Sequence, residues 1–209
     1  MTNKISIAQN RDCMEAMAEF PDKFFDLAIV DPPYGININM NMGRKKGKRK
    51  AHADKTWDKA APGEAYFNEL FRVSKNQIIW GGNYFGLPLT KSWIFWDKNV
   101  PEGVSFADGE LAWTSFDITL KKVLIPYSGF IGSEGKIHPT QKPVKLYKWL
   151  LKNYGNGGGK ILDTHLGSGS SRIAAYDMGF DFWGYEIDAD YFRDQEKRFR
   201  QHTSQLTLI

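Results

Sequence analysis

A short turn in this sequence combines a carboxylate, two prolines and an aromatic ring. Asp31, Pro32, Pro33 and Tyr34 follow a nearly unbroken apolar run at residues 26–30. Proline pushes the preceding residue toward extended geometry and has no N–H, so the turn is stiff and offers mostly hydrogen-bond acceptors. The Asp31 carboxylate and the Pro32 carbonyl could each accept one hydrogen of an exocyclic NH2 group, while Tyr34 stacks on the ring that carries it.

An amine of this kind is hard to alkylate, because its lone pair is delocalised into the ring. Two acceptors on its hydrogens favour pyramidalisation as the new bond forms, and a rigid turn would hold the nitrogen toward an electrophile. Asp31 need not take a proton before the attack. The alternative interpretation is a rigid strand-to-loop turn with a capping aspartate.

A glycine-rich loop, DTHLGSGS at residues 163–170, stands between an expected strand and an expected helix. Gly167 and Gly169 let the backbone approach a ligand, and a helix N-terminus favours a negative group. Arg172 stands where a dinucleotide fingerprint needs its third glycine, and this loop lacks the Gly-Lys-Ser/Thr of a P-loop. Glu186, at the end of the next strand, could accept hydrogen bonds from ribose hydroxyls.

Ribose recognition without a pyrophosphate site indicates S-adenosylmethionine, whose methionine carboxylate could take the helix N-terminus. The alternative is an ordinary glycine turn followed by a surface acid.

Strands and helices alternate around these loops. Apolar runs predict strands at residues 4–8, 26–31, 77–80, 92–97, 110–116, 160–163 and 180–188. Helical spacing and capping residues predict helices at 12–20, 64–74, 143–155, 171–179 and 189–199. This pattern favours an open, largely parallel α/β sheet that binds ligands beyond the carboxyl ends of its strands.

Bulk composition indicates one domain of a cytoplasmic protein. Of the 209 residues, 42% are hydrophobic and 25% charged, and no apolar run approaches the roughly 20 residues that span a bilayer. The start lacks a secretory pattern, and the single cysteine, Cys13, permits no intramolecular disulfide. His138 and His165 have no close pair of further ligands, so we expect no metal. Because no apolar run is long enough to span a bilayer, we also expect no membrane partner.

The positive charge is concentrated in one segment, GRKKGKRK at residues 43–50. Without its six basic residues the chain has 22 basic against 24 acidic side chains. The segment contains two glycines and no apolar periodicity, which predicts a mobile basic loop at residues 43–56 that suits a polyanion such as nucleic acid. A merely solvated loop is the alternative. The six residues are Arg44, Lys45, Lys46, Lys48, Arg49 and Lys50.

Taken together, these motifs resemble the amino-directed DNA methyltransferases, which use S-adenosylmethionine and carry a D/N/S-P-P-Y/F/W motif. Here DPPY precedes LDTHLGSGS, and HPTQKP at residues 138–143 stands just ahead of the glycine loop. That order is similar to the beta class. The resemblance implies a Rossmann-like α/β fold with a mostly parallel seven-stranded sheet, helices on both faces and a permuted motif order, in a single domain over residues 1–209. It also implies a target base flipped into the pocket.

By motif match, the resemblance assigns Asp31, Pro32, Pro33 and Tyr34 to the catalytic loop. One departure concerns Thr164 and His165, which stand where the family often has Pro-Phe or Pro-Met, so the resemblance does not establish the usual aromatic or apolar cofactor contact here. The residues expected to bind the cofactor are Asp12, Cys13, Asp31, Thr140, Lys142, Asp163, His165, Gly167, Ser168, Gly169 and Glu186.

The function we predict is methyl transfer from S-adenosylmethionine to N6 of adenine in DNA. Asp at position 31 favours adenine by family habit, and N4 of cytosine is the nearest alternative. An RNA or protein amide substrate and a catalytically silent nucleic-acid-binding module also remain open. We expect target recognition from residues 99–136, phosphate contacts from the basic loop, and contact area from a homodimer.

Overall fold

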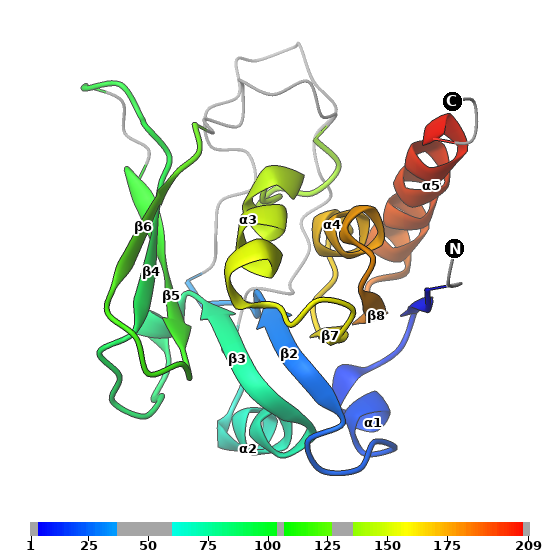
Figure 1. Ribbon diagram of the computed structural model, residues 1–209, viewed down its shortest axis with the longest axis horizontal. Coiled ribbons are helices and arrows are strands. Elements are labelled where there is room, and N and C mark those ends of the chain that lie inside the picture. The colour runs from blue at the N-terminus through cyan, green and yellow to red at the C-terminus, as the bar shows by residue number, and fades with distance from the viewer. Residues whose placement is uncertain (1–3, 37–59, 104–106, 127–135, 207–209) are drawn as a thin grey trace.

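One mixed sheet runs through the described part of the chain, which comprises residues 4–36, 60–103, 107–126 and 136–206 of a computed structural model (Figure 1). Within these ranges the sheet has eight strands in the order β1-β8-β7-β2-β3-β5-β4-β6. Neighbouring strands are parallel except where β5 meets β3 and β4. The strands are β1 (Ser6–Gln9), β2 (Phe25–Val30), β3 (Ser74–Trp80), β4 (Trp93–Asp97), β5 (Gly109–Thr114), β6 (Lys121–Leu124), β7 (Lys160–Asp163) and β8 (Asp181–Tyr185).

Helices cover both faces of this sheet. Buried side chains of α3 and α4 pack with one face, and those of α1 and α2 pack with the other. The helices are α1 (Cys13–Met17), α2 (Glu64–Val73), α3 (Val144–Tyr154), α4 (Ser170–Met178) and α5 (Ala189–Leu206), with a short 3-10 turn, η1 (Gly82–Tyr84). Each expected helix is present, and the Rossmann-like, mostly parallel α/β fold is confirmed.

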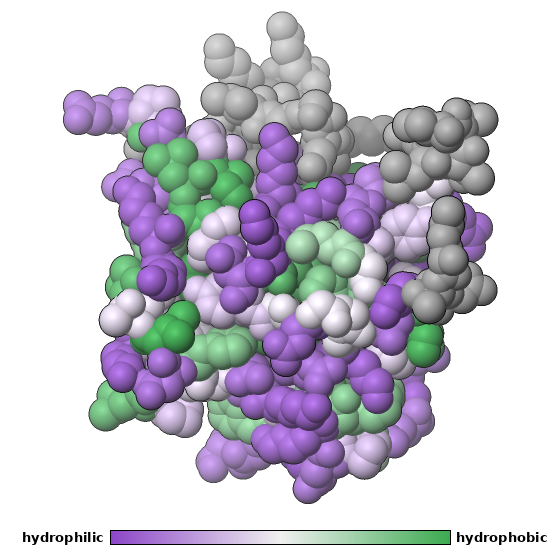
Figure 2. Space-filling model, in the orientation of Figure 1, coloured by the Kyte–Doolittle hydropathy of each residue, from purple (hydrophilic) through white to green (hydrophobic). Residues whose placement is uncertain are grey.

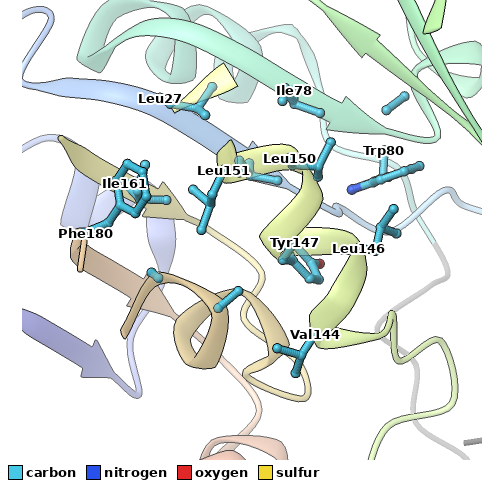
Figure 3. Packing of buried hydrophobic residues seen from close by; sticks show 14 of the residues in the cluster. Leu27, Ile78, Trp80, Val144, Leu146, Tyr147, Leu150, Leu151, Ile161 and Phe180 are labelled. Carbon is cyan, nitrogen blue, oxygen red and sulfur yellow. The ribbon is translucent and has the colours of Figure 1, made fainter. Parts of the chain in front are cut away.

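The central strand β2 shows why the sheet is buried on both sides. Leu27 and Ile29 point into the cluster that contains α3 and α4, whereas Ala28 and Val30 point into the cluster of α1 and α2. All four are at most 1% exposed, as expected for a parallel strand between two helical layers. Figure 3 shows Leu27 among the side chains that face α3.

The strand count differs from the seven expected. The additional strand, β6, is four residues long and pairs with β4 at the edge of the sheet. Its sequence is Lys-Lys-Val-Leu, and only Val123 is buried. A short edge strand with two lysines has too weak an apolar alternation to be recognised in the sequence.

The carboxyl ends of β2, β7 and β8 lie side by side at the same end of the sheet, because these strands are parallel neighbours. The chain leaves β2 toward α2 on one face, and leaves β7 toward α4 on the other. Such a divergence is a topological switch point, where open α/β sheets bind ligands. No helix within the described ranges is long and apolar enough to cross a membrane.

Candidate active site

The Asp-Pro-Pro-Tyr turn begins directly after β2, and its aspartate and tyrosine are bonded to each other. The Tyr34 hydroxyl donates to Oδ1 of Asp31 at 2.7 Å. The Tyr34 ring stacks on Tyr84 of η1 with centroids 5.0 Å apart and planes 14° apart. Gly81 follows β3 with φ +66°, and a Cβ there would lie 2.2 Å from Cε1 of Tyr34. The Tyr34 ring in this position therefore needs a glycine beside it.

Lys142, from the HPTQKP segment, lies between two carboxylates. Its ammonium is 2.5 Å from Oδ2 of Asp31 and 3.0 Å from Oε2 of Glu110. Glu110 in turn accepts from Lys98 Nζ on Oε1 at 2.5 Å. Lys142 is 2% exposed, and Glu110, the most exposed of the four side chains, is 26% exposed. Opposite charges therefore alternate along a shielded row of four side chains.

Burial and charge act against each other in this row. Burial alone lowers the pKa of Lys142, but the two carboxylates outweigh it and raise that pKa above its ordinary value. Burial raises the pKa of Asp31; Lys142 opposes this increase and Glu110 adds to it. For Glu110, burial is outweighed by the two lysines, so its pKa is lowered. Lys142 therefore stays protonated near neutral pH, and its positive charge interacts with both the Asp31 and the Glu110 carboxylate.

The glycine loop is attached to the end of β7 by Asp163. This side chain is 2% exposed, accepts from the Ser171 hydroxyl at 2.5 Å, and accepts from the His165 backbone N–H at 3.0 Å. Burial raises the pKa of Asp163 to about 7. Gly167 and Gly169 have φ of +50° and +72°, which few other residues adopt. Asp163 thus joins β7 to the first turn of α4.

Glu186 follows β8 and fixes the same loop from the other side. Its carboxylate accepts from the Gly167 N–H at 2.8 Å and from the Asp188 N–H at 2.9 Å. Its carbonyl accepts from the Arg11 N–H at 3.1 Å, which brings the start of α1 alongside. Asp12 caps α1 as expected, accepting from the Met14 N–H at 2.7 Å, and Cys13 is half-buried beside it.

The HPTQKP segment connects the two halves of the site. At its start, His138 packs on Tyr191, with centroids 4.3 Å apart, and lies next to Gly167. Thr140 Oγ1 and Nδ1 of His138 are hydrogen-bonded at 3.1 Å. At its end, Lys142 reaches Asp31 in the Asp-Pro-Pro-Tyr turn. A segment of six residues therefore contacts both the glycine loop and Asp31.

The departure at residues 164 and 165 has a structural counterpart on α2. Thr164 Oγ1 shares a hydrogen bond with the Tyr66 hydroxyl at 2.6 Å, and a second one with Nδ1 of His165 at 3.0 Å. The rings of Tyr66 and His165 meet edge to face at 5.4 Å. Burial lowers the pKa of His165 to about 4, so at neutral pH a flat, uncharged ring stands where the family often has an apolar one.

Several functional candidates were not predicted from the sequence: Glu110 and Lys98 beside Lys142, Tyr84 beside Tyr34, and Tyr66 beside Thr164. Glu110 lies within the expected recognition region of residues 99–136, where β5 and β6 belong to the sheet. The six basic residues at 44–50 lie outside the described ranges. In the ranges described, no group of three or more His, Cys, Asp or Glu side chains could hold a metal ion.

Comparison with known proteins gives concordant matches. Residues 79–197 match the family model N6_N4_Mtase, described as DNA methylase. YubD of Escherichia coli (strain K12), whose name includes the word methylase, is 27% identical over 90% of this chain and 87% of its own length.

Two solved structures share the fold. The M1.HpyAVI–SAM complex has a TM-score of 0.61 at 18% identity, covering 91% of this chain and 97% of its own. PvuII DNA methyltransferase, described as cytosine-N4-specific, has a TM-score of 0.60 at 13% identity, covering 96% and 92%.

Proposed function

Since the chain belongs to the N6_N4_Mtase family of DNA methylases, we propose that it transfers a methyl group from S-adenosylmethionine to an exocyclic amine of a base in DNA, and that this amine is N6 of adenine. The observation that carries the proposal is the fixed Asp31 carboxylate at the switch point, held by Tyr34 and Lys142 next to the strand that leads into the glycine loop.

The residues around the glycine loop fit the cofactor. The Glu186 carboxylate accepts from the backbone N–H groups of Gly167 and Asp188, which fixes it beside the glycine loop, at the strand end where an acidic residue accepts from ribose hydroxyls. The N-terminus of α4, which follows Gly169, favours a carboxylate such as that of the methionine moiety. Bound there, S-adenosylmethionine supplies an electrophilic methyl group on a sulfonium.

The catalytic turn orients the target amine. Asp31 has two carboxylate oxygens with about four acceptor sites, of which Tyr34 and Lys142 occupy two, so the remaining ones can accept from an amine hydrogen. The Pro32 carbonyl takes the other hydrogen. The raised pKa of Asp31 suits its carboxylate to receive the proton released after transfer.

Adenine is the first choice of base on the strength of Asp31 and the family's habit. N4 of cytosine is the second candidate, because it presents a similar amine on a smaller ring, and because a structure with the same fold is described as cytosine-N4-specific. Both reactions would use the same acceptors.

The test is nucleoside mass spectrometry of DNA incubated with the protein and isotopically labelled S-adenosylmethionine. We expect label in N6-methyladenine, and its loss in Asp31→Ala. Label in N4-methylcytosine would identify cytosine, instead of adenine, as the target base. No label in any base of mixed-sequence duplex or single-stranded DNA would overturn the proposal and favour RNA, a protein amide or a silent binding module.

A further inference from the structure

Two strands that carry no residue of the expected site contribute a carboxylate and a lysine to it. Glu110 is the second residue of β5 and pairs across the ladder with Trp96 of β4. Lys98 follows β4, and its backbone N–H donates to the Asp108 carbonyl at 2.9 Å. This antiparallel pairing places Lys98 and Glu110 next to each other, with Oε2 of Glu110 3.0 Å from the Lys142 ammonium.

Without Glu110, Asp31 would be the only carboxylate paired with the Lys142 ammonium among the ion pairs of the described residues. The shielded ammonium lies 2.5 Å from Oδ2 of Asp31, and so strong an ion pair makes the carboxylate a weaker acceptor for a neutral amine. The second carboxylate, 3.0 Å from the same nitrogen, draws part of this interaction away. Lys98 compensates the charge of Glu110, so that the row remains neutral as a whole.

We propose that Glu110, supported by Lys98, is a positioning residue of the site: it holds the Lys142 ammonium between two carboxylates and so sets how strongly Asp31 accepts hydrogens from the target amine. This inference rests on the proposed methyl transfer. Glu110 touches neither the substrate nor the cofactor in this role, and it acts through Lys142.

Asp31 is surrounded by titratable groups from several elements, which must be considered in any test by pH. They come from the catalytic turn itself, α2, β5, the segment before α3, α3 and the end of β7. In that order they are Tyr34, Tyr66, Glu110, Lys142, Tyr147 and Asp163. Burial raises the pKa values of the three tyrosines well above their ordinary value, so they stay neutral near pH 7. The lowered pKa of Glu110 and the raised pKa of Lys142 keep both groups charged there. Asp163, with a pKa of about 7, is therefore the group in this set whose charge changes near neutral pH.

Two charge-changing variants of opposite sign provide the test. Glu110→Gln keeps the shape and removes a negative charge, so Lys142 binds Asp31 more strongly; we expect the acidic limb of the pH profile of kcat to move down by about one unit, with kcat about tenfold lower and the KM for S-adenosylmethionine little changed. Lys98→Met removes a positive charge behind Glu110, and we expect the acidic limb to move up. Lys75 lies near the amino end of β3 and is paired with Asp26 of β2. Lys75→Met makes the same change of net charge as Lys98→Met, but at the end of these strands opposite to the site, and should leave the limb in place.

The second readout does not depend on activity. The Asp31 carboxyl carbon is followed by NMR titration and assigned by its loss in Asp31→Asn; its pKa should fall in Glu110→Gln and rise in Lys98→Met. The inference is overturned if the acidic limb of the kcat profile and the Asp31 pKa measured by NMR stay unchanged, or if they move in the same direction in both variants. If the wild-type protein transfers label but the variants show no opposite shifts, the proposed methyl transfer stands and only the role of Glu110 is overturned. If the wild-type protein transfers no label, the proposed function is overturned, and the NMR titration still tests the effect of Glu110 on Asp31. If Glu110→Gln does not fold, Lys98→Met carries the test.

Discussion

Asp31 is restrained from two directions before any substrate arrives. Tyr34 holds one oxygen and Lys142 the other, so the carboxylate cannot rotate freely and its remaining lone pairs have fixed directions. Preorganised acceptors of this kind are effective because they need not reorient when charge develops. The acceptor role of the turn could be predicted from residue types alone. The contact with Lys142 could not, because 111 residues separate the two in the sequence.

Asp163 gives a prediction about stability that follows from its burial. Its folded-state pKa of about 7 exceeds the ordinary value, so the native protein binds more protons than the unfolded chain between about pH 4 and 7. Its contribution to stability is therefore present below about pH 4 and is lost as pH rises through 7. In Asp163→Asn, the decrease in the free energy of unfolding from pH 4 to pH 8 should be smaller than in the wild type, by an amount on the order of 3 kcal/mol.

Urea unfolding at several pH values measures this difference. His165, with its pKa lowered to about 4 by burial, changes stability in the opposite direction in the same window, so only the difference between wild type and variant isolates Asp163. The exposed Asp117→Asn is the matched control. Identical pH dependence in wild type and Asp163→Asn would mean that Asp163 is not protonated near neutrality.

At the level of elements, local patterns located the strands and helices better than they located the site. The buried runs of β2 and β7 and the amphipathic faces of α2 and α3 are visible in the sequence, because burial imposes a period on side chains. Glu110 is different. It follows a glycine at the start of an apolar strand, and only the antiparallel register of β4 and β5 brings it to Lys98 and Lys142. Register depends on pairing partners, which a single strand does not specify.

The turn after β3 makes a testable contribution to the catalytic loop. In Gly81→Ala, the new Cβ would lie 2.2 Å from Cε1 of Tyr34, so the ring must leave the position in which its hydroxyl donates to Asp31. Both the positive φ and this clash oppose the substitution, and a left-handed conformation alone costs about 1 kcal/mol. We expect more than tenfold lower kcat, measured by transfer of labelled methyl groups, besides a loss of stability measured by urea unfolding.

Gly179→Ala separates the two effects. Gly179, the residue after α4, has a φ of +72°, and a Cβ at this position would have no atom of the described residues within 4 Å, so the substitution carries the backbone strain without the clash. It should lower the free energy of unfolding by a similar backbone term and leave kcat near the wild-type value. Equal decreases of kcat in both variants would show that the position of Tyr34 does not depend on Gly81.

For the whole molecule, one pairing of strands brings together two motifs that lie far apart in the sequence. The catalytic turn follows β2, early in the chain, and the glycine loop follows β7, late in the chain, yet β2 and β7 are neighbours with Ala28 opposite Leu162. On the face seen in Figure 2, hydrophilic residues are interspersed with smaller apolar patches. The homodimer expected from the sequence stays a prediction.

The distribution of charge predicts how the protein binds DNA. Without the six basic residues at 44–50 the chain carries a net charge of −2, so nonspecific attraction to phosphates should come mainly from that segment. Replacing all six by glutamine should weaken binding to duplex DNA, and should flatten the dependence of log K on log salt by about 0.9 for each phosphate that the segment no longer neutralises.

The control makes the same change of charge elsewhere, at six exposed lysines of the described ranges: Lys4, Lys75, Lys91, Lys121, Lys152 and Lys197. Because counterion release depends on lysines and arginines that contact phosphates rather than on net charge, the control should keep most of the wild-type slope, while cofactor binding stays unchanged in both variants. Fluorescence anisotropy with labelled duplex at several salt concentrations gives the slopes. Equal slopes for the wild type and the 44–50 variant would place the phosphate contacts outside this segment, and the described lysines would then be the residues to test.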